Sequence, residues 1–289
     1  MARSRRRRGS GVVSFVFLAT LAVVGGVIVA VWRGAGPLPD PEGCKAVVSG
    51  RTVDLAPDQA RNAALIAALA VRRGLPARAA SIALATAYQE SKIRNLAHGD
   101  RDSVGIFQQR PSQGWGTAEQ IQDEHYAINK FYDVLVKIDN YEAMRITEAA
   151  QKVQRSGFPE AYEDHAPDAR ALASALTGYS PGGTFTCVVH QPAGHGTAAA
   201  VSRSLASAYG SDLSVERTGG RQDLTIPVAA GQDGNRRGWS VASYLIAYAG
   251  DLKVESVAFD GLIWRSGRTS EKGWTSSGAS GQRVRVTLR

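Results

Sequence analysis

The sequence is poor in cysteine and lacks several common catalytic motifs. Its 289 residues include only two cysteines, Cys44 and Cys187, with no C-x-x-C pair and no His/Cys cluster at zinc spacing. We therefore expect no metal site. The sequence also has no phosphate-binding loop and no Ser/His/Asp arrangement with a supporting context. Any chemistry is expected to rely on protein side chains without a cofactor.

Acidic residues are absent from the first 33 positions, which carry six arginines. This segment accounts for most of the formal net charge of +8, because the remaining chain has 28 lysines and arginines against 26 acidic residues. A nearly balanced body attracts a polyanion only weakly. We therefore expect no nucleic-acid partner.

Long apolar runs are also scarce, and the most prominent one lies near the N-terminus. Residues 11–32 follow a basic tip at residues 1–10 and are almost wholly apolar or small. About 20 such residues cross a lipid bilayer as a helix, and the flanking arginines orient the N-terminus to the cytoplasm. A cleaved signal peptide usually has a shorter apolar core and a small-x-small site. We therefore favour a single-pass plasma-membrane anchor with an extracytoplasmic body, and one span disfavours a transporter or channel.

The two cysteines fit an extracytoplasmic location. Oxidising compartments favour pairing Cys44 with Cys187, which would close a loop spanning most of the region after the anchor. In the chain-entropy model, such a closure stabilises the fold by about 4–5 kcal/mol. Two unpaired buried thiols are the alternative.

Proline- and glycine-rich segments divide the chain. We predict linkers at residues 33–43 and 191–196, a mainly helical domain at 44–190 and a small α/β domain at 197–289, an overall α+β fold that is mainly α. Periodicity and capping signals predict helices over 57–73, 77–90, 117–137, 147–155, 167–177, 197–209 and 237–249. Extended segments are predicted at 44–55, 185–189, 213–217, 224–228, 254–259, 262–264 and 283–288.

Glu90 is the leading candidate for a catalytic residue. It is predicted to lie at the C-terminal end of a helix that is apolar nearly all round, where the helix dipole disfavours a negative charge. Tyr88 and Phe107 are candidate neighbours, and loss of solvent raises a carboxyl pKa. A partly protonated carboxylic acid is what general-acid cleavage of a glycosidic bond requires. The alternative is a glutamate in solvent or paired with Lys92 or Arg94.

The residues around Glu90 resemble the signature of soluble lytic transglycosylases and other lysozyme-like peptidoglycan enzymes. In that family a catalytic Glu-Ser precedes a Gly-Leu-Met-Gln run and a proline. The matching residues here are Glu90-Ser91, Gly105-Ile106-Phe107-Gln108 and Pro111. The resemblance covers roughly residues 55–180. It implies that Glu90 is the general acid and that Gln108 lines the cleft, where an amide suits sugar hydroxyls and N-acetyl groups.

Three positions depart from this pattern. Gly99 stands where the family has serine, Arg110 stands where methionine is common, and no Ala-Tyr-Asn motif follows. The nearest counterpart of that motif is 153–156, with Tyr162 close by. The run 103–116 is also similar to membrane-anchored lysozyme-like proteins of actinobacteria.

Several further side chains are candidate contacts for a sugar strand. They are Tyr88, Ser91, Gln109, Trp115 and Tyr162. Trp115 lies between two glycines, so it either stacks on a sugar ring or fills the base of its loop. The resemblance adds no metal or cofactor to this set.

A second carboxylate would decide between hydrolysis and transglycosylation. Asp100 and Asp102 follow Glu90 in a polar loop, and goose-type lysozymes use acids in a comparable loop to position water. Lytic transglycosylases need only one glutamate, because a hydroxyl of the sugar itself attacks. The alternative is that both aspartates serve only as turn residues.

The C-terminal segment, 197–289, contains no recognisable catalytic constellation and resembles small accessory domains of actinobacterial secreted wall hydrolases. The expected function is cleavage of peptidoglycan strands by a muramidase or lytic transglycosylase. The alternative is a non-catalytic wall-binding or scaffold protein with a lysozyme-like fold. In either case the expected partners are peptidoglycan and, through residues 11–32, the lipid bilayer.

Overall fold

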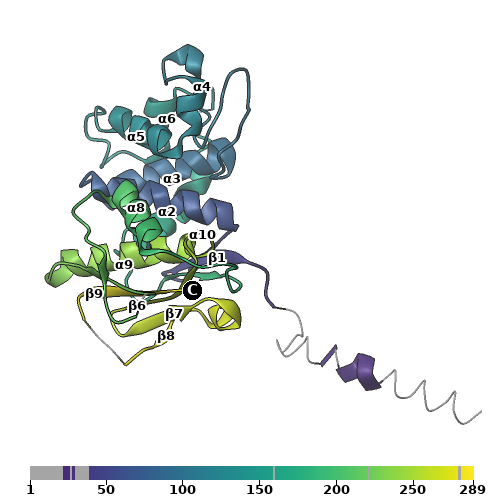
Figure 1. The fold of residues 1–289 in the computed structure, drawn as a ribbon. Helices are drawn as coiled ribbons and strands as arrows, with labels where there is room; N and C mark the ends of the chain where they lie inside the picture. Colours follow the sequence, from purple (N-terminus) through teal and green to yellow (C-terminus); the bar gives the residue numbers. More distant parts are fainter. Residues whose placement is uncertain (1–21, 27, 30–38, 159, 221, 279–280) are drawn as a thin grey trace, which may run out of the picture. The chain divides into compact units, whose positions relative to one another are not determined.

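The computed structural model describes residues 22–26, 28–29, 39–158, 160–220, 222–278 and 281–289. The chain separates into two units, Met1–Pro41 and Glu42–Arg289. The second unit contains helices and antiparallel sheets, so the predicted α+β class is confirmed (Figure 1).

The predicted membrane span, residues 11–32, lies mostly outside the described residues. Residues 22–26 and 28–29 are helical and exposed. Within the described part of the chain, no helix combines the length and apolar character that crossing a bilayer requires. The anchor stays a prediction from the sequence.

Helix α2 (Pro57–Arg72) lies at the centre of the second unit. Pro57 occupies its first turn, as predicted, where the missing backbone N–H costs nothing. The buried residues of α2 are mostly alanine, which lets neighbouring helices approach from several sides. It packs against α3 (Ala77–Ser91), α8 (Ala198–Tyr209) and α9 (Gly231–Ala247), as Figure 1 shows.

The structure divides the helix predicted over 117–137. The short helix α4 (Ala118–Gln122) begins at the predicted capping box of Thr117. Helix α5 (Glu124–Leu135) then begins anew at Asp123, whose carboxylate accepts hydrogen bonds from two backbone N–H groups of the first turn. The prediction of one helix was wrong because an internal aspartate provides a second N-cap.

Two of the remaining helices agree closely with the predicted ranges. Helix α6 (Ile146–Gln154) and helix α7 (Ala166–Leu176) each lie within one residue of the prediction. Both pack on α3 and complete the helical part of the unit. Helix α9 begins six positions before the predicted residue 237 and is followed by α10 (Ala249–Leu252). Short 3-10 turns η1 (Pro111–Gln113), η2 (Glu163–His165) and η3 (Gly267–Lys272) lie in connections.

Two antiparallel sheets complete the unit. The first has the order β2-β1-β3, and the second has the order β4-β5-β9-β6-β7-β8. Their strands are β1 (Gly43–Val48), β2 (Arg51–Leu55), β3 (Phe185–Val188), β4 (Glu216–Arg217), β5 (Asp223–Pro227), β6 (Val254–Phe259), β7 (Leu262–Arg265), β8 (Thr275–Ser276) and β9 (Arg283–Leu288). Because every pairing in the second sheet is antiparallel, the C-terminal segment is α+β rather than the predicted α/β.

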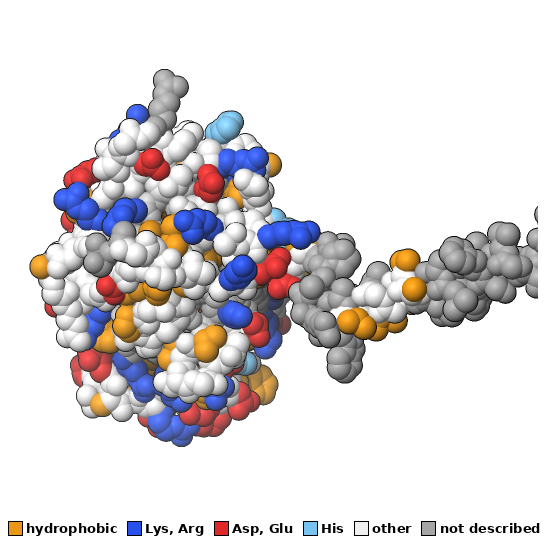
Figure 2. Space-filling model, turned by 90° about the horizontal axis from the view of Figure 1, so that it is seen from below, with side chains coloured by type: hydrophobic (Ala, Val, Ile, Leu, Met, Phe, Trp, Pro, Cys, Tyr) orange, Lys and Arg blue, Asp and Glu red, His pale blue; other side chains and the backbone are white. Residues whose placement is uncertain are grey.

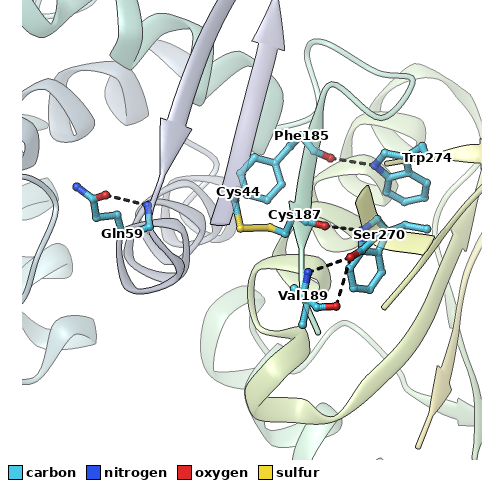
Figure 3. Close-up of a disulfide and its surroundings, with 9 residues drawn as sticks. Cys44, Gln59, Phe185, Cys187, Val189, Ser270 and Trp274 are labelled. Atoms are coloured by element: carbon cyan, nitrogen blue, oxygen red, sulfur yellow. Dashed lines mark hydrogen bonds between the residues drawn. A yellow bond between two sulfur atoms is a disulfide. The ribbon is translucent and has the colours of Figure 1, made fainter. Parts of the chain in front are cut away.

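The predicted disulfide between Cys44 and Cys187 is present and joins β1 to β3 (Figure 3). The free edge of β3 is held by side chains from the C-terminal segment. The indole N–H of Trp264 donates to the carbonyl of Cys187, and that of Trp274 donates to the carbonyl of Phe185, both at 2.9 Å. The disulfide therefore lies where the first sheet meets the C-terminal segment.

The segments 44–190 and 197–289 share one hydrophobic core. Buried apolar side chains form a single cluster that runs from the helices through α9 to the second sheet. Trp264 is fully buried in this cluster. The proposed boundary at 191–196 stays a prediction. On the face seen in Figure 2, basic and acidic side chains are interspersed, in line with the balanced charge of this part of the chain.

Candidate functional site

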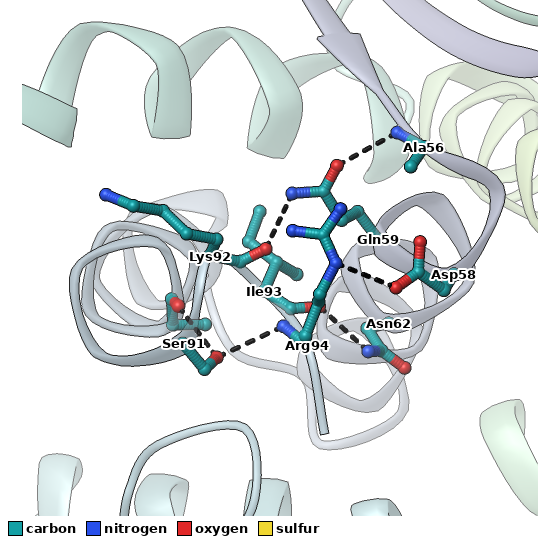
Figure 4. A network of polar contacts seen from close by, with 9 residues as sticks. Ala56, Asp58, Gln59, Asn62, Ser91, Lys92, Ile93 and Arg94 are labelled. Atoms are coloured by element: carbon teal, nitrogen blue, oxygen red, sulfur yellow. Dashed lines mark hydrogen bonds and ion pairs between the residues drawn. The ribbon is translucent and has the colours of Figure 1, made fainter. Parts of the chain in front are cut away.

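Glu90 occupies the last turn of α3, and an unusual backbone follows it. Lys92 and Ile93 both have left-handed conformations, with φ of 56° and 58°. Two amides of α2 hold this segment: Gln59 Nε2 donates to the Lys92 carbonyl at 2.7 Å, and Asn62 Nδ2 donates to the Ile93 carbonyl at 2.8 Å (Figure 4). The end of the helix that carries Glu90 is thus fixed from the side of α2.

Ser91 connects the helix end to the Gly-Ile-Phe-Gln loop. Its hydroxyl group is buried and donates to the carbonyl of Ile106 at 2.6 Å, and it accepts from the backbone N–H of Arg94 at 3.1 Å. A hydroxyl group that is committed to backbone in the interior is poorly placed for a sugar. The role of Ser91 is therefore to position the loop beside Glu90.

The carboxyl group of Glu90 is largely withdrawn from water and has two polar neighbours. Burial raises its pKa above the ordinary value, and hydrogen bonds from Tyr162 and Gln154 partly oppose that rise. The Tyr162 hydroxyl donates to Oε1 of Glu90 at 2.7 Å. Burial and the nearby carboxylate raise the pKa of Tyr162 as well, so the phenol keeps its proton. The site holds an acid that ionises with difficulty next to donors that stabilise its ionised form.

The ion pairs considered for Glu90 from sequence are not seen. Arg94 pairs instead with Asp58 of α2, at 3.0 Å between Nε and Oδ2 (Figure 4). Among the described residues, no cationic side chain forms a salt bridge with Glu90 within 4.0 Å. Desolvation is therefore not offset by a nearby positive charge.

Gln154 was missed as a site residue by the sequence reasoning. Its Nε2 donates to the carbonyl of Phe107 at 2.8 Å, and the same amide interacts with Glu90. It lies at the end of α6, in the run that stands nearest to the missing family motif. The run 153–156, together with Tyr162, was the signal in the sequence that could have identified Gln154, because Gln154 and Tyr162 both interact with Glu90.

Gln108 adopts a left-handed conformation with φ of 47° and folds back on its own loop. Its Nε2 donates to the carbonyl of Gly105 at 3.1 Å. A β-carbon added at Gly99 would lie only 1.6 Å from Oε1 of Gln108. Gly99 therefore leaves the space that the Gln108 side chain occupies.

The two aspartates lie in the loop between α3 and η1. Asp102 accepts hydrogen bonds from Arg110 Nε and from the backbone N–H of Ser112, both at 2.8 Å. The hydrogen bond from the Ser112 backbone, followed by that from Arg110, holds the pKa of Asp102 well below its ordinary value. The side chain of Asp100 is 91% exposed, and its Oδ2 lies 3.9 Å from Nε of Arg101. Both aspartates thus have the environment of loop residues.

The other predicted contacts have different surroundings. Gln109 is buried and donates to the carbonyl of Ala127 at 3.3 Å, which commits it to the interior. Tyr88 is half-buried and stacks on His165 with ring centroids 5.0 Å apart. Trp115 is half-buried, packs against the core and lines a groove next to Gln154. Tyr162 is the predicted contact that hydrogen-bonds the acid directly.

Among the described residues, no group of three or more His, Cys, Asp or Glu side chains is arranged to hold a metal ion. No family model matches the chain, and no curated protein matches it. The chemistry of the site is therefore inferred from its own residues, centred on a desolvated carboxylic acid with phenol and amide donors.

Proposed function

We propose that this chain cleaves the β-1,4 linkage between N-acetylmuramic acid and N-acetylglucosamine in peptidoglycan, as a membrane-anchored, extracytoplasmic enzyme. The supporting observation is the raised pKa of Glu90, a carboxyl group that is largely buried and hydrogen-bonded to Tyr162. Such a group retains its proton closer to neutral pH than an exposed glutamate does. It is suited to protonating the leaving oxygen of a glycosidic bond.

The route that fits best uses Glu90 alone. As the C–O bond breaks, Glu90 gives its proton to the leaving oxygen and becomes a carboxylate, which Tyr162 and Gln154 stabilise by hydrogen bonding. The carboxylate then takes the proton of a hydroxyl group on the sugar whose anomeric carbon has lost its leaving oxygen. The oxygen of that hydroxyl group attacks the anomeric carbon and closes an anhydro ring. Asp102 is committed to Arg110 and Ser112, and Asp100 is exposed, which favours this route over one with a second carboxylate.

Digestion of purified sacculi tests the proposal. The full chain in detergent should release muropeptides that end in anhydro-muramic acid, detected by mass spectrometry. Glu90→Gln should reduce release by about 10²–10⁴-fold, the usual contribution of a general acid. Asp102→Asn should leave the product ratio unchanged. Equal release by the wild type and Glu90→Gln, or no release by either, would contradict the proposal. Products that end in a reducing sugar would show hydrolysis instead of transglycosylation.

A non-catalytic wall-binding protein is the second candidate. The observation that favours it is the commitment of Gln108 to its own loop through Gly105, which withdraws an amide that the resemblance assigns to substrate. This function predicts co-sedimentation with sacculi that survives Glu90→Gln, with no release of fragments by the wild type. If Glu90→Gln no longer sediments with sacculi, or if the wild type cleaves strands in a way that depends on Glu90, the non-catalytic function is excluded.

A further inference from the structure

A groove of about 550 Å³ is lined in part by Gln154, a side chain that also interacts with the proposed catalytic acid. Its walls come from Trp115 and its neighbours, from one side of α5, and from the end of α6. Gln154 lines this groove and also interacts with Glu90, so one side chain connects the two places. A strand held at Glu90 would therefore pass close to the groove.

The charge of the groove differs from that of the body as a whole. Its lining includes three basic side chains, Lys130, Lys137 and Arg155, and one acidic side chain, Asp133. Asp133 is already engaged by Arg73 outside the lining, at 2.7 Å between Oδ1 and Nη2. In the described part of the chain, no salt bridge connects the three basic side chains to an acid. The groove thus offers concentrated positive charge to an anionic group.

The backbone at Trp115, the aromatic wall of the groove, is held by Tyr126. The hydroxyl of Tyr126 donates to the carbonyl of Trp115 at 3.1 Å. Gly116 has φ of 131°, and a β-carbon there would lie 2.5 Å from the same hydroxyl. Lys130 lies over the Tyr126 ring, with Nζ 5.4 Å from the centroid. An ordered tryptophan beside basic side chains suits a ligand with both an apolar surface and a negative charge.

We propose that this groove binds the carboxylate-bearing peptide stem of the strand whose glycan lies at Glu90, an assignment that rests on the proposed function for the location of the strand. The glycan is uncharged where each lactyl carboxyl group forms the amide bond to a peptide stem, so the stems supply the carboxylates. Lys137 and Arg155 are exposed at the groove and pair with these carboxylates, and Trp115 packs against the stem. The groove gives the site a preference for strands that retain their peptides.

Binding, measured apart from cleavage, tests the assignment. The full chain carrying Glu90→Gln is sedimented with purified sacculi, with and without Lys137→Gln and Arg155→Gln together. Lys45→Gln with Arg285→Gln removes the same charge from exposed positions on β1 and β9 and serves as the matched control. The groove variant should bind about tenfold more weakly, and the control should bind like its parent. Far-ultraviolet circular dichroism checks that each variant is folded.

Three treated substrates identify the ligand. On strands stripped of peptides by an amidase and then amidated at the lactyl carboxyl groups that the amidase sets free, the groove variant should bind no more weakly than its parent. The same result is expected on intact sacculi whose carboxylates are amidated. On sacculi freed of phosphate polymers, the tenfold difference should persist. Equal binding of intact sacculi by variant and parent would overturn the assignment, as would a difference that persists on stripped strands or disappears with the phosphate polymers.

The result is separable from the fate of the proposed enzyme. If the wild type releases no fragments and the groove variant still binds peptide-bearing sacculi more weakly, the enzyme proposal fails and the groove assignment stands. If strands are cleaved and the groove variant retains full binding, the groove assignment fails alone.

Discussion

At the scale of single residues, the hydroxyl group of Tyr162 makes Glu90 easier to ionise. It donates to the carboxylate and so lowers a pKa that burial raises. Tyr162→Phe removes this donor and should raise the pKa of Glu90 further. Because a general acid works only while protonated, the limb of the pH–activity profile that falls with rising pH should move to higher pH.

Muropeptide release measured across pH checks this shift. Tyr179→Phe removes a hydroxyl group from an exposed ring and should leave the pH–activity profile unchanged. An unchanged or acid-shifted profile for Tyr162→Phe would contradict the role given to the hydroxyl group.

Glu90 should also cost the protein stability at neutral and higher pH. Its folded-state pKa lies above the ordinary 4.5, so the fold favours the protonated form and penalises the ionised one. The stabilising contribution is complete below pH 4.5 and is lost as pH rises through the folded-state pKa. Glu90→Gln removes the ionised form, so its melting temperature should match the wild type near pH 4 and exceed it by a few degrees at pH 8.

Thermal unfolding at the two pH values is the measurement. Glu216→Gln, at an exposed position on β4, is the matched control and should change little at either pH. A Glu90→Gln variant that is equally or less stable than the wild type at pH 8 would contradict the desolvation of Glu90.

At the scale of elements, the loop from Gly99 to Pro111 is held in place by close backbone contacts. Gly105 has φ of 81°, and a β-carbon there would lie 2.8 Å from the carbonyl oxygen of Ile121. Gly105→Ala should therefore cost about 2–4 kcal/mol, from left-handed strain and from overlap with α4. Urea unfolding would measure the loss.

Gly114→Ala separates the two contributions. Gly114 has the same φ of 81°, but nothing lies within 4 Å of its added β-carbon. It should cost only about 1 kcal/mol, the strain of a left-handed alanine. Similar losses at both positions would show that the contact with Ile121 is unimportant.

The helices illustrate what local patterns predict well. The ends of α2 and α3 follow from Pro57 and from the apolar periodicity, and the structure places both helices where they were expected. The division between α4 and α5 was missed because Asp123 looks like any polar residue of a helix surface. Its capping bonds form only when the chain turns there, which neighbouring elements decide.

At the scale of the whole molecule, the Cys44–Cys187 disulfide closes a loop of 143 residues. Replacing both cysteines by serine should lower the free energy of unfolding by about 2–5 kcal/mol, because the unfolded chain regains the freedom that the cross-link removes. Urea unfolding of the double variant is the measurement. The wild type in reducing agent should unfold at a similar urea concentration, whereas an unchanged midpoint in both would contradict a stabilising role.

The disulfide lies where the first sheet meets the C-terminal segment. Trp264 and Trp274 both hydrogen-bond to β3, one at Cys187 itself. The sequence division at 191–196 describes a change in local pattern from helical to strand-rich. The packing of α9 on α2 and on β6 brings both sides of that division into one hydrophobic cluster.

The sequence by itself determined most helices and strands, the cysteine pair and the position of Glu90 at a helix end, because local periodicity and compartment chemistry carry that information. Only the tertiary structure decided the surroundings of those residues. Ser91 hydrogen-bonds to backbone in the interior, Asp102 pairs with Arg110, and Gln154, 64 positions further along the chain, interacts with Glu90. Such contacts depend on which elements pack together, and a carboxyl group acquires a raised pKa only once packing has removed its water.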